Sequence, residues 1–312
     1  MFLPLVAIRP LSLLTKIFET HGTKDLMAHF LSLTTKSLEQ LRTSGPVRVS
    51  QAAASTNETS RCTVTDDAVI CSRKDALINT GIWLRGVLWE VPVGTPPAAG
   101  WPVVLHFQGS FFAPHLFSWT GSKWMPFGAY HQTLGIKTLL DAGYAVITPE
   151  SHLNGFTFWD TNIPPYSILW SIAPDHFFME ALIKEIANPG GLFGHLNLKA
   201  KYATGISSGG YMTSRMAVSY PGEFRSLVVT SGSYATCAGP VCIVPRLPRD
   251  HPPTLFLHGG SDLIVPQFTM EAYYDELVKD GIPTEKQVVE AAGHEWWEGS
   301  HEHLVSWFRR YP

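Results

Sequence analysis

Charged residues are scarce in this sequence, since they make up 16% of its 312 residues whereas hydrophobic residues make up 45%. This composition excludes a disordered chain and is typical of a globular protein with a large apolar core. There is no run of Lys and Arg, and the formal net charge is -3, so we expect no nucleic-acid partner. There is also no apolar run of about 18 residues, the length that spans a membrane, so we expect no transmembrane segment.

Cysteine is also rare, and its four copies form two close pairs, Cys62 with Cys71 and Cys237 with Cys242. Their spacings fit neither a C-x-x-C redox motif nor a zinc knuckle. Local pairing is the simplest connectivity, and it predicts two disulfides that each close a small loop in an oxidising compartment. Four free thiols in a cytosolic enzyme are the alternative.

The first 55 residues lack the order of a signal peptide. The apolar segment 1–8 is followed, not preceded, by a positive charge at Arg9, and the small residues 52–54 lie too far downstream to be its cleavage site. We therefore expect residues 1–55 to be an extension and residues 56–312 to form one catalytic domain.

From residue 61 onward, short apolar runs alternate with helical patterns. This alternation predicts an α/β fold with a mostly parallel, doubly wound sheet and helices on both faces. A hairpin is expected first, with Cys62 and Cys71 facing each other across a turn. The other expected strands are 82–93, 103–106, 144–148, 201–206, 226–230, 254–258 and 287–290, and the expected helices are 130–142, 178–187, 210–219, 266–279 and 303–310.

One segment, 201–211, is predicted to form a strand that turns sharply into a helix, and it contains Gly205-x-Ser207-x-Gly209. In a nucleophile elbow of the G-x-S-x-G type, the serine lies at the tip of a strained turn with its hydroxyl exposed. Glycines two residues away on either side are required because a side chain there would collide across the bend. This spacing selects Ser207 rather than Ser208 as the nucleophile. A plain Gly/Ser-rich loop is the alternative, so the rest of the chain must supply the partners.

A serine nucleophile needs a base, and the base needs an acid that fixes its tautomer. Asp262 follows the expected strand 254–258, and His294 follows the expected last strand. Both positions lie at the carboxyl ends of parallel strands, where open α/β sheets form their sites. We therefore predict a catalytic triad of Ser207, His294 and Asp262. A turn aspartate and a solvated loop histidine are the alternatives.

Histidines and glutamates near the carboxyl terminus offer a competing interpretation as a metal site. The zincin spacing H-E-x-x-H fails there because residue 298 is Glu rather than His. We therefore expect no metal ion and no other cofactor. Two further strand-end histidines, His106 and His258, are expected to pack against or orient their neighbours. The competing metal set comprises His294, His301, His303, Glu295, Glu298 and Glu302.

An oxyanion hole is expected from two backbone N–H groups. One belongs to Ser208, directly after the nucleophile. The other belongs to the loop after strand 103–106, where Gln108, Gly109 and Ser110 are the candidates and the sequence does not choose among them.

The loops after strands 103–106 and 144–148 are unusually aromatic. Because these loops lie at the predicted site edge, we expect an apolar groove for an acyl chain. For any single aromatic residue in them, a place in the core is the alternative. The predicted lining is Phe111, Phe117, Trp119, Phe156 and Trp159.

The segment G-I-S-S-G-G-Y-M at 205–212, Asp262 within H-G-G-S-D and His294 within G-H-E resemble the polyhydroxyalkanoate depolymerases of the α/β-hydrolase superfamily. The intervals from Ser to Asp to His are most similar to those of the extracellular medium-chain-length branch, the poly(3-hydroxyoctanoate) depolymerases. The resemblance covers roughly residues 61–312 and departs at the amino terminus, where that branch implies a clear signal peptide. Short-chain enzymes usually append a substrate-binding domain, which we do not expect after the last helix here.

The resemblance implies a secreted serine ester hydrolase that depolymerises medium-chain-length polyhydroxyalkanoate, an aliphatic polyester, through an acyl-enzyme. A short-chain polyhydroxybutyrate depolymerase and a general carboxylesterase, lipase or peptidase are the alternatives, since a fold does not fix its substrate. A catalytically silent binding protein of this fold would lack a triad member, whereas all three are present. A cytoplasmic location is the alternative to secretion, and the oligomeric state is not predicted.

Overall fold

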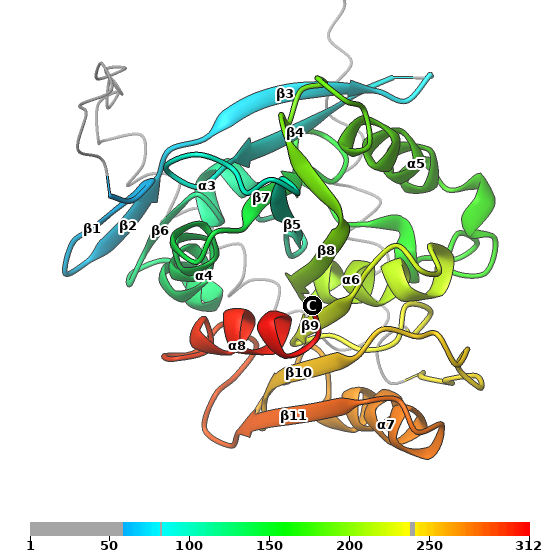
Figure 1. Cartoon of the computed structure of the whole chain (residues 1–312). Coiled ribbons are helices and arrows are strands. Elements are labelled where there is room, and N and C mark those ends of the chain that lie inside the picture. Colours follow the sequence, from blue (N-terminus) through cyan, green and yellow to red (C-terminus); the bar gives the residue numbers. More distant parts are fainter. Residues whose placement is uncertain (1–58, 82, 238–240) are drawn as a thin grey trace, which may run out of the picture. The chain divides into compact units, whose positions relative to one another are not determined.

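A computed structural model describes residues 59–81, 83–237 and 241–312 (Figure 1). The expected extension at residues 1–55 lies outside the described residues. The centre of the fold is an eight-stranded sheet in the order β11-β10-β9-β8-β5-β7-β4-β3. Its strands are β3 (Lys74–Asn79), β4 (Leu84–Glu90), β5 (Trp101–Phe107), β7 (Ala145–Pro149), β8 (Leu196–Ile206), β9 (Ser226–Thr230), β10 (Thr254–Gly259) and β11 (Thr284–Val289).

The sheet is parallel from β7 to β11 and antiparallel at β3 and β4. Every residue of β7 and β9 is buried, which explains why their sequences are continuous apolar runs. The predicted α/β fold with a mostly parallel sheet is therefore confirmed. The expected strand 82–93 is the shorter β4, and its edge partner β3 was not predicted because its half-exposed pattern gives a weak signal.

Helices cover both faces of the sheet (Figure 1). On one face, α4 (Ala129–Asp141) and α8 (Glu302–Arg310) bury residues such as Ile136 and Phe308. On the other face, α5 (Pro174–Ile186) and α6 (Ser208–Ser219) bury residues such as Phe178 and Met212. A further cluster packs α7 (Gln267–Lys279) against β9 and β10. The described residues contain no helix that is long and apolar enough to cross a membrane.

A small three-stranded sheet, β1-β2-β6, joins the first hairpin of the described chain to a later strand. Cys62 and Cys71 are register partners in its first hairpin, as predicted, and they form a disulfide. The second disulfide joins Cys237 and Cys242. The remaining elements are β1 (Cys62–Val64), β2 (Ala68–Cys71), β6 (Thr120–Ser122), the helix α3 (Pro114–Phe117) and 3-10 turns at Pro126–Gly128, Asp160–Asn162 and Trp170–Ile172.

The parallel strands place their carboxyl ends along one edge of the sheet. The loops after β5, β7, β8, β10 and β11 therefore meet there, and these loops carry every residue predicted for the triad and the oxyanion hole.

Candidate active site

Ser207 lies in the turn between β8 and α6 with a φ of 58° and a ψ of -125°. A positive φ is strained for a residue with a side chain and persists only where the surroundings enforce it. Here the N–H of Ser207 donates to the carbonyl of Thr230 at 3.1 Å, and its carbonyl accepts from the N–H of Tyr211 at 3.0 Å. Ser207 remains partly exposed, whereas Ser208 is buried. The turn thus presents the Ser207 hydroxyl at its tip.

Gly205 and Gly209 lie where this turn approaches other backbone most closely. A Cβ atom at Gly205 would lie 2.5 Å from the carbonyl oxygen of Gly209 and 2.6 Å from that of Phe107. A Cβ atom at Gly209 would collide with the carbonyl oxygens of Phe107 and Gln108. Since backbone atoms cannot move away without opening the sheet, these two positions require glycine.

Asp262 and His294 are joined by a hydrogen bond of 2.8 Å between Oδ2 of the carboxylate and Nδ1 of the ring. The other carboxylate oxygen accepts the N–H groups of Ile264 and Val265, both at 2.9 Å. Burial alone would raise the pKa of Asp262, but the hydrogen bond and charge of His294 and the two N–H donors lower that pKa below its ordinary value. The carboxylate is therefore ionised and fixed, and Nε2 is the ring nitrogen of His294 that this hydrogen bond does not use.

The two other strand-end histidines, His106 and His258, pack against different neighbours. Nε2 of His258 bonds to the carbonyl of Val265 at 2.9 Å and lies 3.7 Å from Oδ2 of Asp262. The His106 ring stacks on Trp296, with ring centroids 6.1 Å apart, and burial lowers the pKa of His106 to about 4. Both rings are fully buried at strand ends, as expected for packing and orienting residues.

The loop after β5 brings Gly109 beside Ser207. A Cβ atom at Gly109 would lie 3.6 Å from the Cβ atom of Ser207. The side chain of Gln108 is committed elsewhere: its Nε2 donates to the carbonyls of Gly155 at 2.5 Å and Gly109 at 3.2 Å, and its Oε1 accepts from Ser151 at 3.3 Å. These hydrogen bonds occupy the Gln108 side chain, so its backbone N–H is the group of this residue that could contact an oxyanion.

The aromatic groove requires a correction. Trp119 and Trp159 are fully buried, and their Nε1 atoms donate to Thr148 at 2.6 Å and to the carbonyl of Gln108 at 3.1 Å. Buried indoles with satisfied N–H groups are core residues, so neither lines an open groove. Phe111 and Phe156 are exposed, whereas Phe117 is half-buried and packs edge-on against Phe112.

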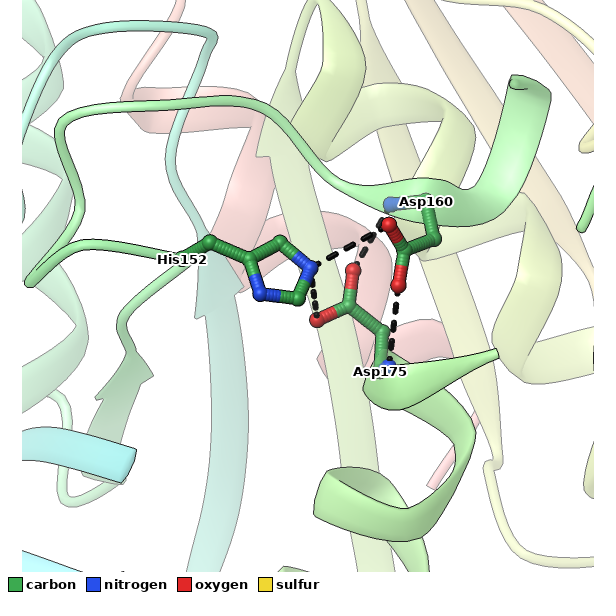
Figure 2. Close-up of side chains that lie close together, drawn as sticks. All are labelled: His152, Asp160 and Asp175. Atoms are coloured by element: carbon green, nitrogen blue, oxygen red, sulfur yellow. Dashed lines mark hydrogen bonds and ion pairs between the residues drawn. The ribbon is translucent and has the colours of Figure 1, made fainter. Parts of the chain in front are cut away.

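A second polar cluster, which sequence reasoning missed, joins His152, Asp160 and Asp175 (Figure 2). Nε2 of His152 lies 3.1 Å from Asp160 and 3.4 Å from Asp175. The two aspartates also exchange hydrogen bonds, since each accepts the backbone N–H of the other, at 2.7 and 3.1 Å. Arg85 completes the cluster with a 2.9 Å ion pair to Asp175.

Histidine and aspartate side chains can bind a metal ion, but the carboxylate oxygens of this cluster already accept hydrogen bonds. All four carboxylate oxygens of Asp160 and Asp175 accept hydrogen bonds from His152, Arg85 or backbone N–H groups. A cation would have to displace a buried guanidinium, so the cluster fits a structural brace better than a metal site. The three residues are scattered over residues 152–175 with no ligand spacing, which explains why no sequence pattern revealed them.

The fold defines the class of protein. An α/β hydrolase from a Medee basin deep-sea metagenome library matches with a TM-score of 0.53 and 14% identity, over 77% of this chain and 98% of that one. A thermostable esterase matches with a TM-score of 0.52 and 16% identity, over 76% of this chain and 62% of that one. The protein therefore has the α/β-hydrolase fold. No protein-family model matches the chain.

A curated relative narrows the class. The chain is 46% identical over 263 residues to a protein of Pseudomonas fluorescens named poly(3-hydroxyoctanoate) depolymerase, covering 84% of this chain and 92% of the relative. The chain belongs to the poly(3-hydroxyoctanoate) depolymerase family and is a carboxylic ester hydrolase.

Proposed function

We propose that this protein depolymerises medium-chain-length polyhydroxyalkanoate, such as poly(3-hydroxyoctanoate), by hydrolysing its ester bonds through an acyl-enzyme. The observation that carries the proposal is the Asp262–His294 hydrogen bond, on the same sheet edge as the strained Ser207 turn. The 46% identity to the named depolymerase supports the choice of polyester.

In the first half-reaction, Nε2 of His294 takes the proton of Ser207 as Oγ attacks the ester carbonyl carbon. The carbonyl oxygen becomes an oxyanion that accepts the N–H of Ser208 and a backbone N–H from residues 108–110, of which Gly109 lies beside Ser207. The ester C–O bond then breaks, and the leaving alkoxide takes the proton from His294. In the second half-reaction, His294 deprotonates water, which attacks the acyl-enzyme and releases the acid and the free serine.

Asp262 acts through His294 rather than on the substrate. Its Oδ2 holds Nδ1–H, which selects the tautomer with a basic Nε2 and stabilises the ring when it is charged. Its Oδ1 ties down the backbone at Ile264 and Val265, so the carboxylate cannot turn away.

A medium-chain polyester carries apolar side chains of several carbons. Each CH₂ group buried by the enzyme contributes about 0.8 kcal/mol. The exposed rings of Phe111 and Phe156, on the loops after β5 and β7, are the candidates that contact these side chains.

We also propose that residues 56–312 form the catalytic domain and that the protein acts outside the cell. The disulfides Cys62–Cys71 and Cys237–Cys242 support the location, because such bonds persist in oxidising compartments.

The test is clearing of a poly(3-hydroxyoctanoate) latex beside a poly(3-hydroxybutyrate) suspension and hydrolysis of a soluble p-nitrophenyl ester. We expect the octanoate latex and the soluble ester to be hydrolysed. Clearing of the butyrate polymer alone would reject the medium-chain assignment and leave the serine-hydrolase chemistry standing. Absence of hydrolysis of all three substrates would reject both.

A further inference from the structure

The connection from β7 to α5, residues 151–173, buries several polar groups and exposes six large apolar side chains, although Trp159 and Trp170 within it are buried. Loops that face water normally show the opposite arrangement, because apolar surface in water is unfavourable and polar groups in the interior need partners. This connection touches the loop after β5, since the N–H of Phe111 donates to the carbonyl of Thr157 at 2.7 Å.

The inner side of the connection is held by Arg215 of α6, which is buried. Its guanidinium donates to the carbonyl of Thr161 at 2.8 Å, to that of Ser167 at 3.0 Å and to the Thr161 hydroxyl at 3.1 Å. It also lies 4.9 Å from the ring of Trp170. Because α6 begins directly after Ser207, the helix of the nucleophile also carries this connection.

Two more sets of polar contacts hold the inner side of the connection. Near its start, the side-chain amide of Gln108 binds Ser151 and Gly155. In its middle, Asp160 is locked to Asp175 and His152 (Figure 2). These contacts hold the backbone of the connection in place, so its exposed side chains are fixed in position.

The outer side is mostly apolar, with Asn154 and Ser171 as its exposed polar side chains. Ile168 is 83% exposed, Leu153 73% and Leu169 52%. Among the exposed residues of this connection, all of which the structure describes, none is charged, and Asp160 is buried. The large apolar side chains are Leu153, Phe156, Ile163, Ile168, Leu169 and Ile172, which together we call the apolar face.

We propose that the apolar face docks on the surface of the solid polyester and holds Ser207 beside it. The inference rests on the proposed function, because it takes its partner from the polymer that the site would cleave. An aliphatic polyester presents hydrocarbon side chains and uncharged esters, so it matches a face without charge. The exposed residues of the connection offer no charged group to a charged macromolecule. Six exposed large apolar side chains in one connection are typical of an interaction site.

Adsorption can be measured apart from catalysis in a Ser207→Ala background, where the polymer stays intact. The test variant carries Ile168→Ser and Leu169→Ser. The matched control carries Leu77→Ser and Leu192→Ser, which remove two apolar side chains of comparable exposure, 61% and 46%, outside the connection. Binding to poly(3-hydroxyoctanoate) latex is followed by depletion of protein from the supernatant.

We expect the test variant to need at least about tenfold more latex for half-maximal binding, because two apolar contacts are lost, and the control to bind as the parent does. With Ser207 restored, the test variant should keep the parent's kcat/KM on a soluble ester, since that substrate needs no surface.

Unchanged adsorption of the test variant, or an equal loss in the control, would overturn the proposal. A shift from dimer to monomer in sedimentation, with adsorption unchanged, would also overturn it and assign the face to a second copy of the chain. An enzyme that hydrolyses no ester would reject the proposed function, whereas the adsorption comparison would still stand on its own result.

Discussion

Asp160 and Asp175 each accept the backbone N–H of the other, at 2.7 and 3.1 Å, although 15 residues separate them. The exchange ties the start of α5 to the middle of the connection from β7, and Arg85 from β4 neutralises part of the buried charge. Two carboxylates can share this site only because the ring of His152 and the guanidinium supply positive charge and donors.

The cluster of His152, Asp160, Asp175 and Arg85 should make the stability of the fold depend on pH. One substitution should remove this dependence. Burial would lower the pKa of His152, but its hydrogen bond to Asp160 and the charge of Asp175 raise that pKa above its ordinary value. The charged ring therefore contributes stability that is fully present below about pH 6.5 and is lost as the pH rises through the folded-state pKa. We expect His152→Gln to flatten the change in melting temperature between pH 6 and 9. An exposed control, His195→Gln, should keep the wild-type slope, and a parallel pair of wild-type and His152→Gln curves would contradict the assignment.

We expect alanine substitutions at the two adjacent serines, Ser207 and Ser208, to lower activity by different amounts. Ser207→Ala should abolish hydrolysis of a soluble ester with unchanged melting, because no other hydroxyl occupies the tip of the turn. Ser208→Ala should retain measurable turnover, since its buried side chain is not the nucleophile and its backbone N–H is kept. An equal loss of kcat in both variants would show that Ser207 is not the nucleophile.

Asp262→Asn should lower kcat about a thousandfold or more, because the amide cannot stabilise the charged imidazole. It should also change stability in a defined direction. The pKa of Asp262 is lowered in the folded protein, so its ionised form contributes stability above the ordinary pKa of Asp that is lost as the pH falls through the folded-state value. Urea unfolding of wild type and variant should differ at pH 7 and converge in acid; an enzyme with near-wild-type turnover would mean that another acid serves His294.

The exposed rings near the site predict a dependence on acyl length. Phe111→Ala combined with Phe156→Ala should lower kcat/KM more for p-nitrophenyl octanoate than for the acetate, because only the longer chain reaches apolar contacts. Trp83→Ala, which removes a 44% exposed ring from the β3–β4 hairpin, outside both loops, is the control. An identical loss on both esters would show that these rings do not contact the acyl chain.

Both disulfides should be present in protein produced in an oxidising compartment. Peptide mass spectrometry without reduction should recover the pairs Cys62–Cys71 and Cys237–Cys242. Replacing either pair with serine should cost about 2–3 kcal/mol of unfolding free energy, since both loops are short. Four free thiols in protein exported by its native host would contradict the proposed location.

The sequence by itself determined the fold class and the order of the candidate triad. Gly205 and Gly209 single out Ser207 because the need for glycine at a sharp turn is a local steric requirement. Asp262 and His294 could be placed because parallel strands bring their carboxyl ends to one edge, whatever the details of packing. The hairpin between Cys62 and Cys71 was predictable because its two strands are close along the chain.

Only the tertiary structure decided which side chains face outward and which long-range partners meet. Trp119 and Trp159 have the same loop context in the sequence as Phe156, yet the two indoles are buried and the phenyl ring is exposed. The Arg85–Asp175 pair and the contacts of Arg215 with the 151–173 connection join elements 90 and about 50 residues apart. Such pairings depend on how the helices pack on the sheet, and local residue patterns carry no record of that packing.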